Sequence, residues 1–242
     1  PLYLPLTLDE EDQSKGTPIF FGGLNVYLSQ KFKLFRKAPN WLRNIFNAKI
    51  IIRSIGKIAG KTRGKDVGAL TLSMIRGEEG NQLKELEELV SWIKEGDKPD
   101  IICLSNALLI GMSRRLREEL SIPVICLLEG EDTFLDSLPS PEREKSWEEI
   151  QRRVSDVSLF ISPSRYYSSV MAERAAIPRE RLVQIYNGIN LEGYNTSPLP
   201  DAPPVLGYFA RLCPEKGLDR LIDAYIIVRN SGRIPNLKLA IG

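Results

Sequence analysis

Short apolar runs alternate with polar segments of helical periodicity from about residue 100 to the end of the chain. An apolar run of strand length, followed by a helix and then by another such run, is typical of strands that pair in parallel. The expected strands cover 100–104, 123–128, 157–161, 182–186, 205–209 and 237–241, and the expected helices cover 106–120, 146–155, 164–175 and 217–229. This alternation predicts an α/β fold with a doubly wound parallel sheet.

A proline-rich stretch interrupts the alternation and predicts a linker over residues 198–204. Its prolines are Pro198, Pro200, Pro203 and Pro204. The sequence therefore predicts a first domain over 1–197 and the opening strand, helix and strand of a second unit over 205–242. The apolar run at 2–8 has the character of a second strand, and no helix follows the strand at 237–241. We accordingly expect a chain truncated at both ends.

Polar residues follow the carboxyl ends of the expected strands. Parallel strands end at one edge of the sheet, and open α/β folds bind ligands there. A ligand-binding role therefore competes with a plainer interpretation, in which short loops between strands and helices are polar because they meet solvent. The candidates are Ser105 and Asn106, Glu129 to Asp132 (including Glu131), Ser162 and Ser164, Asn187 and Gly188, and Arg211.

Four carboxylates lie in the segment CLLEGEDTFLDSLP at 126–139, without a cation among them. Grouped carboxylates after a buried strand could bind sugar hydroxyls, help to position an acceptor, or raise one another's pKa by repulsion. For Asp132 and Asp136, a helix cap or a solvated loop remains an equal alternative.

Two cations lie in the loop of the segment VLGYFARLCPEKGLD at 205–219. A buried strand is expected to end near Phe209, and a helix is expected to begin at Gly217. The unpaired N–H groups of that helix, together with Arg211 and Lys216, would offer a binding site to a diphosphate. A solvated turn with two surface charges is the alternative, because this spacing alone is a weak motif.

The strings GYFARLCPEKGLDRLIDAY at 207–225, ISPSRYYSSVM at 161–171 and IYNGIN at 185–190 resemble glycosyltransferase family four, the retaining nucleotide-sugar enzymes of GT-B fold. The resemblance implies a Rossmann-like acceptor-side domain and the start of a donor-side domain. It also implies that Arg211 and Lys216 contact the donor diphosphate, and that no metal ion or other cofactor is required.

The resemblance further implies transfer of a sugar from a nucleoside-diphosphate sugar to a sugar or lipid-linked acceptor. The family has a glycine-pair loop, which Gly22 and Gly23 match, although a plain turn is equally open for that pair. In the family, the paired glutamates that hold the donor belong to a part of the second domain not represented here. The isolated chain is therefore expected to be inactive.

The N-terminal part of the chain is basic. Residues 13–65 contain no acidic residue, and aromatic residues are interspersed with the cations of 31–65. This pattern is typical of an interfacial helix attracted to anionic lipid, or of a basic helix that packs on the domain. A non-catalytic lipid-binding α/β module is therefore the alternative to a transferase. No nucleic-acid-binding motif is present, so no nucleic-acid partner is expected.

Composition excludes several classes of enzyme. The chain has no histidine, which removes Ser-His-Asp hydrolases and histidine-ligated zinc sites, and it lacks a Walker motif. Cys103, Cys126 and Cys213 do not have metal-binding spacing, so we expect them to be reduced and buried. With no secretory signal or long apolar run, the expected location is cytoplasmic, at the inner face of the membrane if the basic segment binds lipid.

Overall fold

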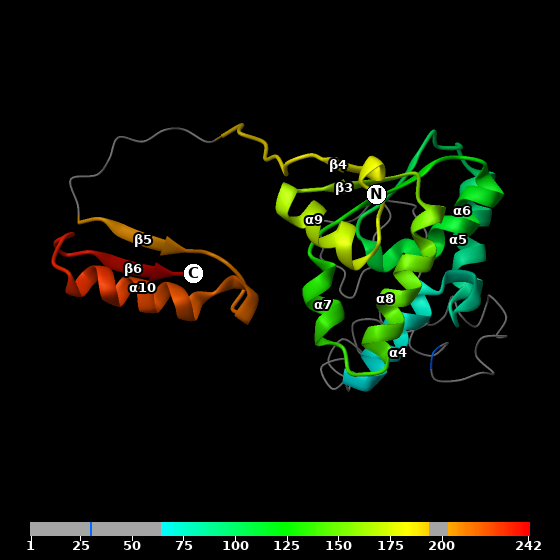
Figure 1. The fold of residues 1–242 in the computed structure, drawn as a ribbon. Helices are drawn as coiled ribbons and strands as arrows, with labels where there is room; N and C mark the ends of the chain where they lie inside the picture. Colours follow the sequence, from blue (N-terminus) through cyan, green and yellow to red (C-terminus); the bar gives the residue numbers. More distant parts are fainter. Residues whose placement is uncertain (1–29, 31–63, 194–202) are drawn as a thin grey trace, which may run out of the picture. The chain divides into compact units, whose positions relative to one another are not determined.

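The computed structural model describes residue 30, residues 64–193 and residues 203–242 (Figure 1). The chain divides into two compact units between Gly188 and Ile189, and each unit is described by itself. The predictions for Gly22, Gly23 and all but the last two residues of the basic segment 31–65 lie outside the described residues. Most of the predicted linker at 198–204 lies outside them as well.

The described residues of the first unit form a parallel sheet of four strands in the order β1-β2-β3-β4. Neighbouring strands pair in register through Leu104, Cys126, Phe160 and Leu182. The strands are β1 (Ile102–Leu104), β2 (Val124–Leu127), β3 (Leu159–Ser162) and β4 (Leu182–Gln184). The predicted α/β fold with parallel strands is confirmed.

Helices connect and flank these strands (Figure 1). The α-helices are α4 (Gly64–Ile75), α5 (Leu83–Glu95), α6 (Ser113–Leu120), α7 (Glu131–Ser137), α8 (Glu142–Arg153) and α9 (Arg165–Arg174). The 3-10 turns are η3 (Gly77–Glu79), η4 (Ala107–Met112), η5 (Val154–Asp156) and η6 (Arg179–Arg181). The helix predicted over 106–120 is divided into η4 and α6, and α7 forms within the acidic segment 126–139, where no helix was among the expected elements.

One face of the sheet forms the core of the first unit. Side chains alternate between the two faces of a strand, and Leu104, Val124, Cys126 and Phe160 are all buried on the same face. Helix residues Leu116, Ile150 and Met171 belong to the same buried cluster. Burial of each such apolar side chain contributes about 1.5–3 kcal/mol, so this layer fixes the sheet against its helices.

The cysteines are all free thiols, but only one of them is buried. Cys126 lies on the core face of β2, and burial raises the pKa of its thiol. Cys103 is exposed and lies on the face of β1 opposite Leu104; among the described strands, β1 is at the edge of the sheet. Cys213 is half-buried in a loop of the second unit. The prediction that all three are buried was therefore wrong for Cys103 and Cys213.

Two glycines allow the backbones of η3 and η4 to cross closely. Gly77 has a φ of 58°, in the left-handed region, and Gly111 is its neighbour across the crossing. A Cβ atom at Gly77 would lie 1.8 Å from the carbonyl oxygen of Gly111. Neither backbone has room for a side chain, so this crossing requires glycine at Gly77 for both its conformation and its space.

The second unit contains one strand-helix-strand motif. Strand β5 (Val205–Tyr208) pairs in parallel with β6 (Lys238–Ile241), and α10 (Leu218–Asn230) connects them. The strand prediction at 205–209 is confirmed, but its predicted burial was wrong: the side chain of Val205 is 56% exposed and that of Phe209 is 95% exposed. Among the described residues of this unit, only α10 and β6 lie beside β5, and they leave part of its side-chain surface exposed to solvent.

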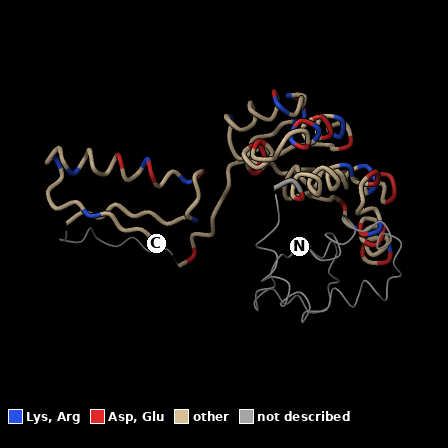
Figure 2. Tube along the Cα trace, turned by 90° about the horizontal axis from the view of Figure 1, so that it is seen from below, with Lys and Arg blue, Asp and Glu red and all other residues tan. Residues whose placement is uncertain are grey.

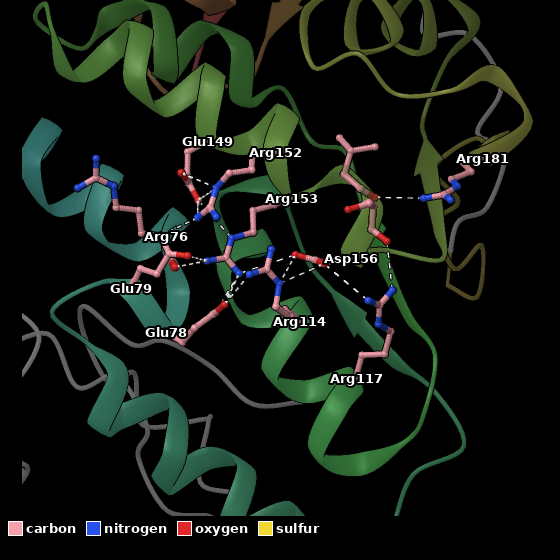
Figure 3. Close-up of polar contacts among 12 residues, drawn as sticks. Arg76, Glu78, Glu79, Arg114, Arg117, Glu149, Arg152, Arg153, Asp156 and Arg181 are labelled. Carbon is pink, nitrogen blue, oxygen red and sulfur yellow. Dashed lines mark hydrogen bonds and ion pairs between the residues drawn. The ribbon is translucent and has the colours of Figure 1, made fainter.

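A buried arginine lies at the centre of an ion-pair network in the first unit (Figure 3). The side chain of Arg153, at the end of α8, is 0% exposed. Its guanidinium donates hydrogen bonds of 2.9 Å to both carboxylate oxygens of Glu78, one of 3.2 Å to Glu149, and one to the carbonyl oxygen of Arg76. Arg153 therefore ties α8 to the η3 turn.

The same network continues to α6. Arg114 donates to Glu78 and to Asp156, each at 3.2 Å, and Arg117 lies 3.6 Å from the other carboxylate oxygen of Asp156. The hydrogen bond and negative charge of Asp156 raise the pKa of Arg114. Because these charges are satisfied by one another, we interpret the network as a structural feature that joins η3, α6, α8 and η5.

Charges of both signs lie side by side on the described helices (Figure 2). Helix α8, for example, carries Glu149 and Arg152 in an i,i+3 ion pair of 2.6 Å. Such pairing neutralises charge locally and contributes less than about 1 kcal/mol at exposed positions. Among the described residues, none of the helices is both apolar enough and long enough to cross a membrane.

Candidate functional site

The carboxyl edge of the four-stranded sheet brings several predicted site residues onto neighbouring loops. Asn106 follows β1, and its side-chain oxygen accepts a 3.1 Å hydrogen bond from the backbone N–H of Leu108, which caps η4. Ser164 follows β3, and its hydroxyl accepts a 3.1 Å bond from Tyr167 N–H, which caps α9. Both residues thus begin helical segments, and both lie at the predicted edge.

Glu131 opens α7 after β2 and is buried, with 4% of its surface exposed. One carboxylate oxygen accepts a 2.6 Å hydrogen bond from the backbone N–H of Ala107. The other accepts 2.9 Å bonds from the N–H of Glu129 and from the hydroxyl of Tyr167. The carboxylate therefore connects the loop after β1, the loop after β2 and helix α9.

Tyr167 is the residue of this edge that sequence reasoning missed. Its hydroxyl donates to Glu131 and accepts a 3.4 Å hydrogen bond from the N–H of Asp132. Burial and the negative charge of Glu131 raise the pKa of Tyr167 far above its ordinary value, so the phenol remains neutral and keeps its proton for donation. The available signal was its spacing, three residues after the cap residue Ser164.

The remaining candidates at this edge face more solvent. Asp132 is half-buried, whereas Glu129, Asn187 and Gly188 are exposed. Gly130 has a φ of 90°, and a Cβ atom placed on it would meet no atom within 4 Å. The same open space surrounds Gly188. The loops after β2 and β4 therefore expose both polar side chains and bare backbone at their tips.

Asp136 has a balancing cation, although none occurs within the segment 126–139. Arg174 of α9 donates two hydrogen bonds, of 2.5 and 2.6 Å, to the two oxygens of Asp136. Trp147 Nε1 donates a third, of 3.2 Å, and the guanidinium carbon of Arg174 lies 4.2 Å from the centroid of the Trp147 ring. These donors lower the pKa of Asp136, with the Arg174 hydrogen bond as the largest cause.

We expect an Asp136→Asn variant to be less sensitive to acid than the unmodified protein. The ion pair contributes stability above the ordinary carboxyl pKa of 3.8, and this stability is lost as the pH falls through the lowered pKa of the folded state. Because Asp136 and Arg174 are partly exposed, the contribution is below about 1 kcal/mol.

Urea unfolding at pH 7 and at pH 2.5 measures this effect. The stability difference between the unmodified protein and Asp136→Asn should shrink toward zero at the lower pH. Asp97→Asn, at an exposed position between α5 and β1, is the control and should show no such change. A difference for Asp136→Asn that is the same at both pH values would contradict the prediction.

The loop after β5 contains the two predicted diphosphate ligands. Arg211 and Lys216 are both exposed, and neither forms a salt bridge within the described parts of the chain. Lys216 ends the 3-10 turn η7 (Pro214–Lys216), and α10 begins two residues later, after Gly217 with a φ of 63°. The two cations therefore lie on the same short loop as the N-terminus of a 13-residue helix.

Glu215 is a further charged residue of this loop that sequence reasoning missed. A hydrogen bond from Cys213 is the largest cause that lowers its pKa, and the positive charges of Arg211 and Lys216 contribute as well. Both cations therefore act electrostatically on the Glu215 carboxylate. In the sequence, the position of Glu215 immediately before Lys216 was the signal that could have identified it. An anion bound here would share the two cations with Glu215.

A metal centre requires several ligands close together. Within residues 64–193 and 203–242, no group of three or more cysteine, aspartate or glutamate side chains has the geometry to hold a metal ion. The carboxylates at the sheet edge are instead separated: Glu131 is held by protein donors, and Asp136 pairs with Arg174.

Comparisons with known proteins bear on this arrangement. Residues 59–192 match the model of the family described as Glycosyltransferase Family 4. The matched stretch covers more than half of the 242 residues and includes all four strands of the sheet in the first unit, together with the loops at its carboxyl edge. A comparison with curated proteins finds no match to the chain.

Proposed function

Because the chain belongs to glycosyltransferase family 4, we propose that it is part of a retaining glycosyltransferase that moves a sugar from a nucleoside-diphosphate sugar to a sugar or lipid-linked acceptor. The observation that carries this proposal is the family match over the entire four-stranded sheet. The polar loops at the carboxyl edge of that sheet support it, because open α/β folds bind their ligands there.

The two domains expected from the sequence have separate roles in this proposal. Residues 1–197 form the acceptor-side domain, in which Asn106, Asp132 and Ser164 offer polar groups to the acceptor. Asn187 and Gly188 do the same at the end of β4. Residues 205–242, after the linker, belong to the donor-side domain. Gly22 and Gly23 complete the proposed set of sugar-binding positions through their backbone.

Arg211 and Lys216 act on the donor diphosphate. As the bond between sugar and diphosphate breaks, negative charge accumulates on the departing phosphate oxygens. Exposed cations that are already in place beside a helix N-terminus stabilise that charge without a large rearrangement. In this proposal the two side chains replace a divalent metal ion, and the reaction takes place on the cytoplasmic side of the membrane when the acceptor is lipid-linked.

We expect Lys216→Ala in the full-length protein to lower kcat by about 100-fold, the effect of removing one group that stabilises developing charge. The acceptor KM should change by less than about threefold, since Lys216 acts on the donor. Steady-state kinetics with a nucleoside-diphosphate sugar and a varied acceptor concentration separates the two effects.

Lys238→Ala is the matched control for this experiment. Lys238 is also an exposed lysine of the second unit, but it pairs with Val205 at the start of the strands, whereas the diphosphate loop follows their ends. Turnover of Lys238→Ala should remain within about twofold of the unmodified protein, as is usual for a surface substitution away from a site. Equal turnover of Lys216→Ala and the unmodified enzyme would exclude the assigned role.

A further inference from the structure

We propose that Glu131 is a positioning residue that holds the loops of the acceptor edge in one arrangement and does not itself bind the acceptor. This inference rests on the proposed function, because it concerns the edge assigned to the acceptor. The sequence left several roles open for the carboxylates of this segment, among them direct binding of sugar hydroxyls, and the inference assigns Glu131 a role in positioning instead.

The contacts of Glu131 carry the inference. Both carboxylate oxygens are occupied by protein donors: the N–H of Ala107 on one oxygen, and the N–H of Glu129 with the hydroxyl of Tyr167 on the other. These donors belong to η4, to the loop after β2 and to α9, which are 24, 2 and 36 residues away in sequence. A single side chain therefore joins segments that follow three different strands.

The burial of Glu131 makes these hydrogen bonds necessary. An ionised carboxylate with 4% exposure is costly unless its oxygens accept strong hydrogen bonds. Glu131 forms no salt bridge with any described residue, so the two N–H groups and the phenol are what stabilise the charge. Hydrogen bonds to a charged acceptor are about twice as strong as bonds between neutral groups, which makes this connection rigid.

Tyr167 extends the connection to the third loop. Its hydroxyl bonds to Glu131 and to the N–H of Asp132, while its own N–H bonds to the hydroxyl of Ser164. Asn106 is the residue immediately before Ala107. Of the three residues proposed to face the acceptor, Asp132 and Ser164 each form a hydrogen bond with Tyr167, and Asn106 is joined to Glu131 through Ala107, by one peptide bond and one hydrogen bond. The pair defined by Glu131 and Tyr167 therefore sets where those groups lie.

Glu131→Gln tests the inference with little change of volume. One carboxylate oxygen becomes an NH₂ group, which cannot accept, so at least one of the two backbone N–H groups loses its partner. Amide hydrogen exchange, resolved by NMR in the full-length protein, should accelerate by about tenfold or more at Ala107 or Glu129. Exchange at Cys126 and Phe160, in the core strands, should stay unchanged.

The kinetic expectation distinguishes positioning from simple stabilisation. The acceptor KM of Glu131→Gln should rise about tenfold, because misplaced binding groups must be ordered when the acceptor binds. The donor KM should change by less than about twofold, and the protein should remain folded at the assay temperature. Glu148→Gln, the same change at an exposed position of α8, is the control and should alter neither exchange nor kinetics.

Tyr167→Phe is the second variant, and it keeps the test valid if Glu131→Gln does not fold. It keeps the aromatic ring and removes only the hydroxyl, so Asp132 N–H loses its acceptor while Ala107 N–H keeps Glu131. Exchange should therefore accelerate at Asp132 and not at Ala107, with a smaller rise in acceptor KM than in Glu131→Gln.

Two results would overturn the inference. One is unchanged exchange at Ala107 and Glu129 in Glu131→Gln together with unchanged exchange at Asp132 in Tyr167→Phe. The other is faster exchange with no change in acceptor KM, which would leave only a structural role. If the unmodified protein transfers no sugar, the proposed function fails by itself. The exchange measurement needs no substrate, and it then still decides whether Glu131 holds the loops.

Discussion

An Arg153→Met variant is expected to lose about 3–5 kcal/mol of unfolding free energy in the first unit, because it removes one partner of a buried ion-pair network. The side chain of Arg153 is 0% exposed and donates to Glu78, Glu149 and the carbonyl oxygen of Arg76. Methionine fills a similar volume but leaves these acceptors without their donor. Chemical denaturation followed by circular dichroism measures the loss.

Arg152→Met is the control for this experiment, since it makes the same substitution one residue earlier. Arg152 also pairs with Glu149 and Glu79, but its side chain is 42% exposed, so water replaces the lost hydrogen bonds. Arg152→Met should therefore lose less than about 1 kcal/mol of unfolding free energy. Equal losses for the two variants would show that burial of the Arg153 guanidinium does not determine the cost.

A Gly77→Ala variant should also be strongly destabilised, by about 3–5 kcal/mol, because two costs add at one position. Its φ of 58° is unfavourable for alanine, and its Cβ atom would lie 1.8 Å from the carbonyl oxygen of Gly111. The Cβ atom is fixed to the backbone of residue 77, and the oxygen that it would meet belongs to the backbone of Gly111, so no side-chain rotation can relieve the contact. The η3 and η4 segments would have to move apart, which thermal unfolding of the purified variant should register as a lower Tm.

Gly130→Ala separates these two costs. Gly130 also has a positive φ, of 90°, but a Cβ atom there meets nothing within 4 Å. Gly130→Ala should therefore lose only about 1–2 kcal/mol of unfolding free energy, the cost of the backbone conformation alone. A Gly77→Ala variant no less stable than Gly130→Ala would mean that the crossing of η3 and η4 relaxes without cost.

Local periodicity was enough to predict the strands, because each strand is short and apolar and is followed by a helix. The six expected strands correspond to β1 through β6, and their pairing is parallel as predicted. Helix α7 was not among the expected elements. Its carboxylates Glu131, Asp132 and Asp136 left a helix cap and a solvated loop equally open, and the burial of Leu135, which packs the segment against the core, becomes evident only in the fold.

The sequence predicted that the site residues lie along the carboxyl edge of the sheet, but it did not predict which side chains contact one another there. Residues that follow parallel strands must lie along the same edge, so the neighbourhood of Asn106, Glu131 and Ser164 follows from topology alone. The partner of each side chain does not, because it depends on residues brought near by folding. The spacing of Tyr167 from Ser164 indicates a place in the first turn of α9, but it does not indicate Glu131, 36 residues away, as the hydrogen-bond partner of its hydroxyl.

The order of the strands, their parallel pairing and the family could be predicted from the sequence, since periodicity and motif strings are properties of neighbouring residues. Which charges are buried, and which groups satisfy them, depends on contacts that form only when the chain folds. Arg153 reaches Glu78 across 75 positions, and Glu131 reaches Ala107 across 24. Two charged residues can look alike in the sequence, but a charge removed from water must find its donors or acceptors wherever the fold places them.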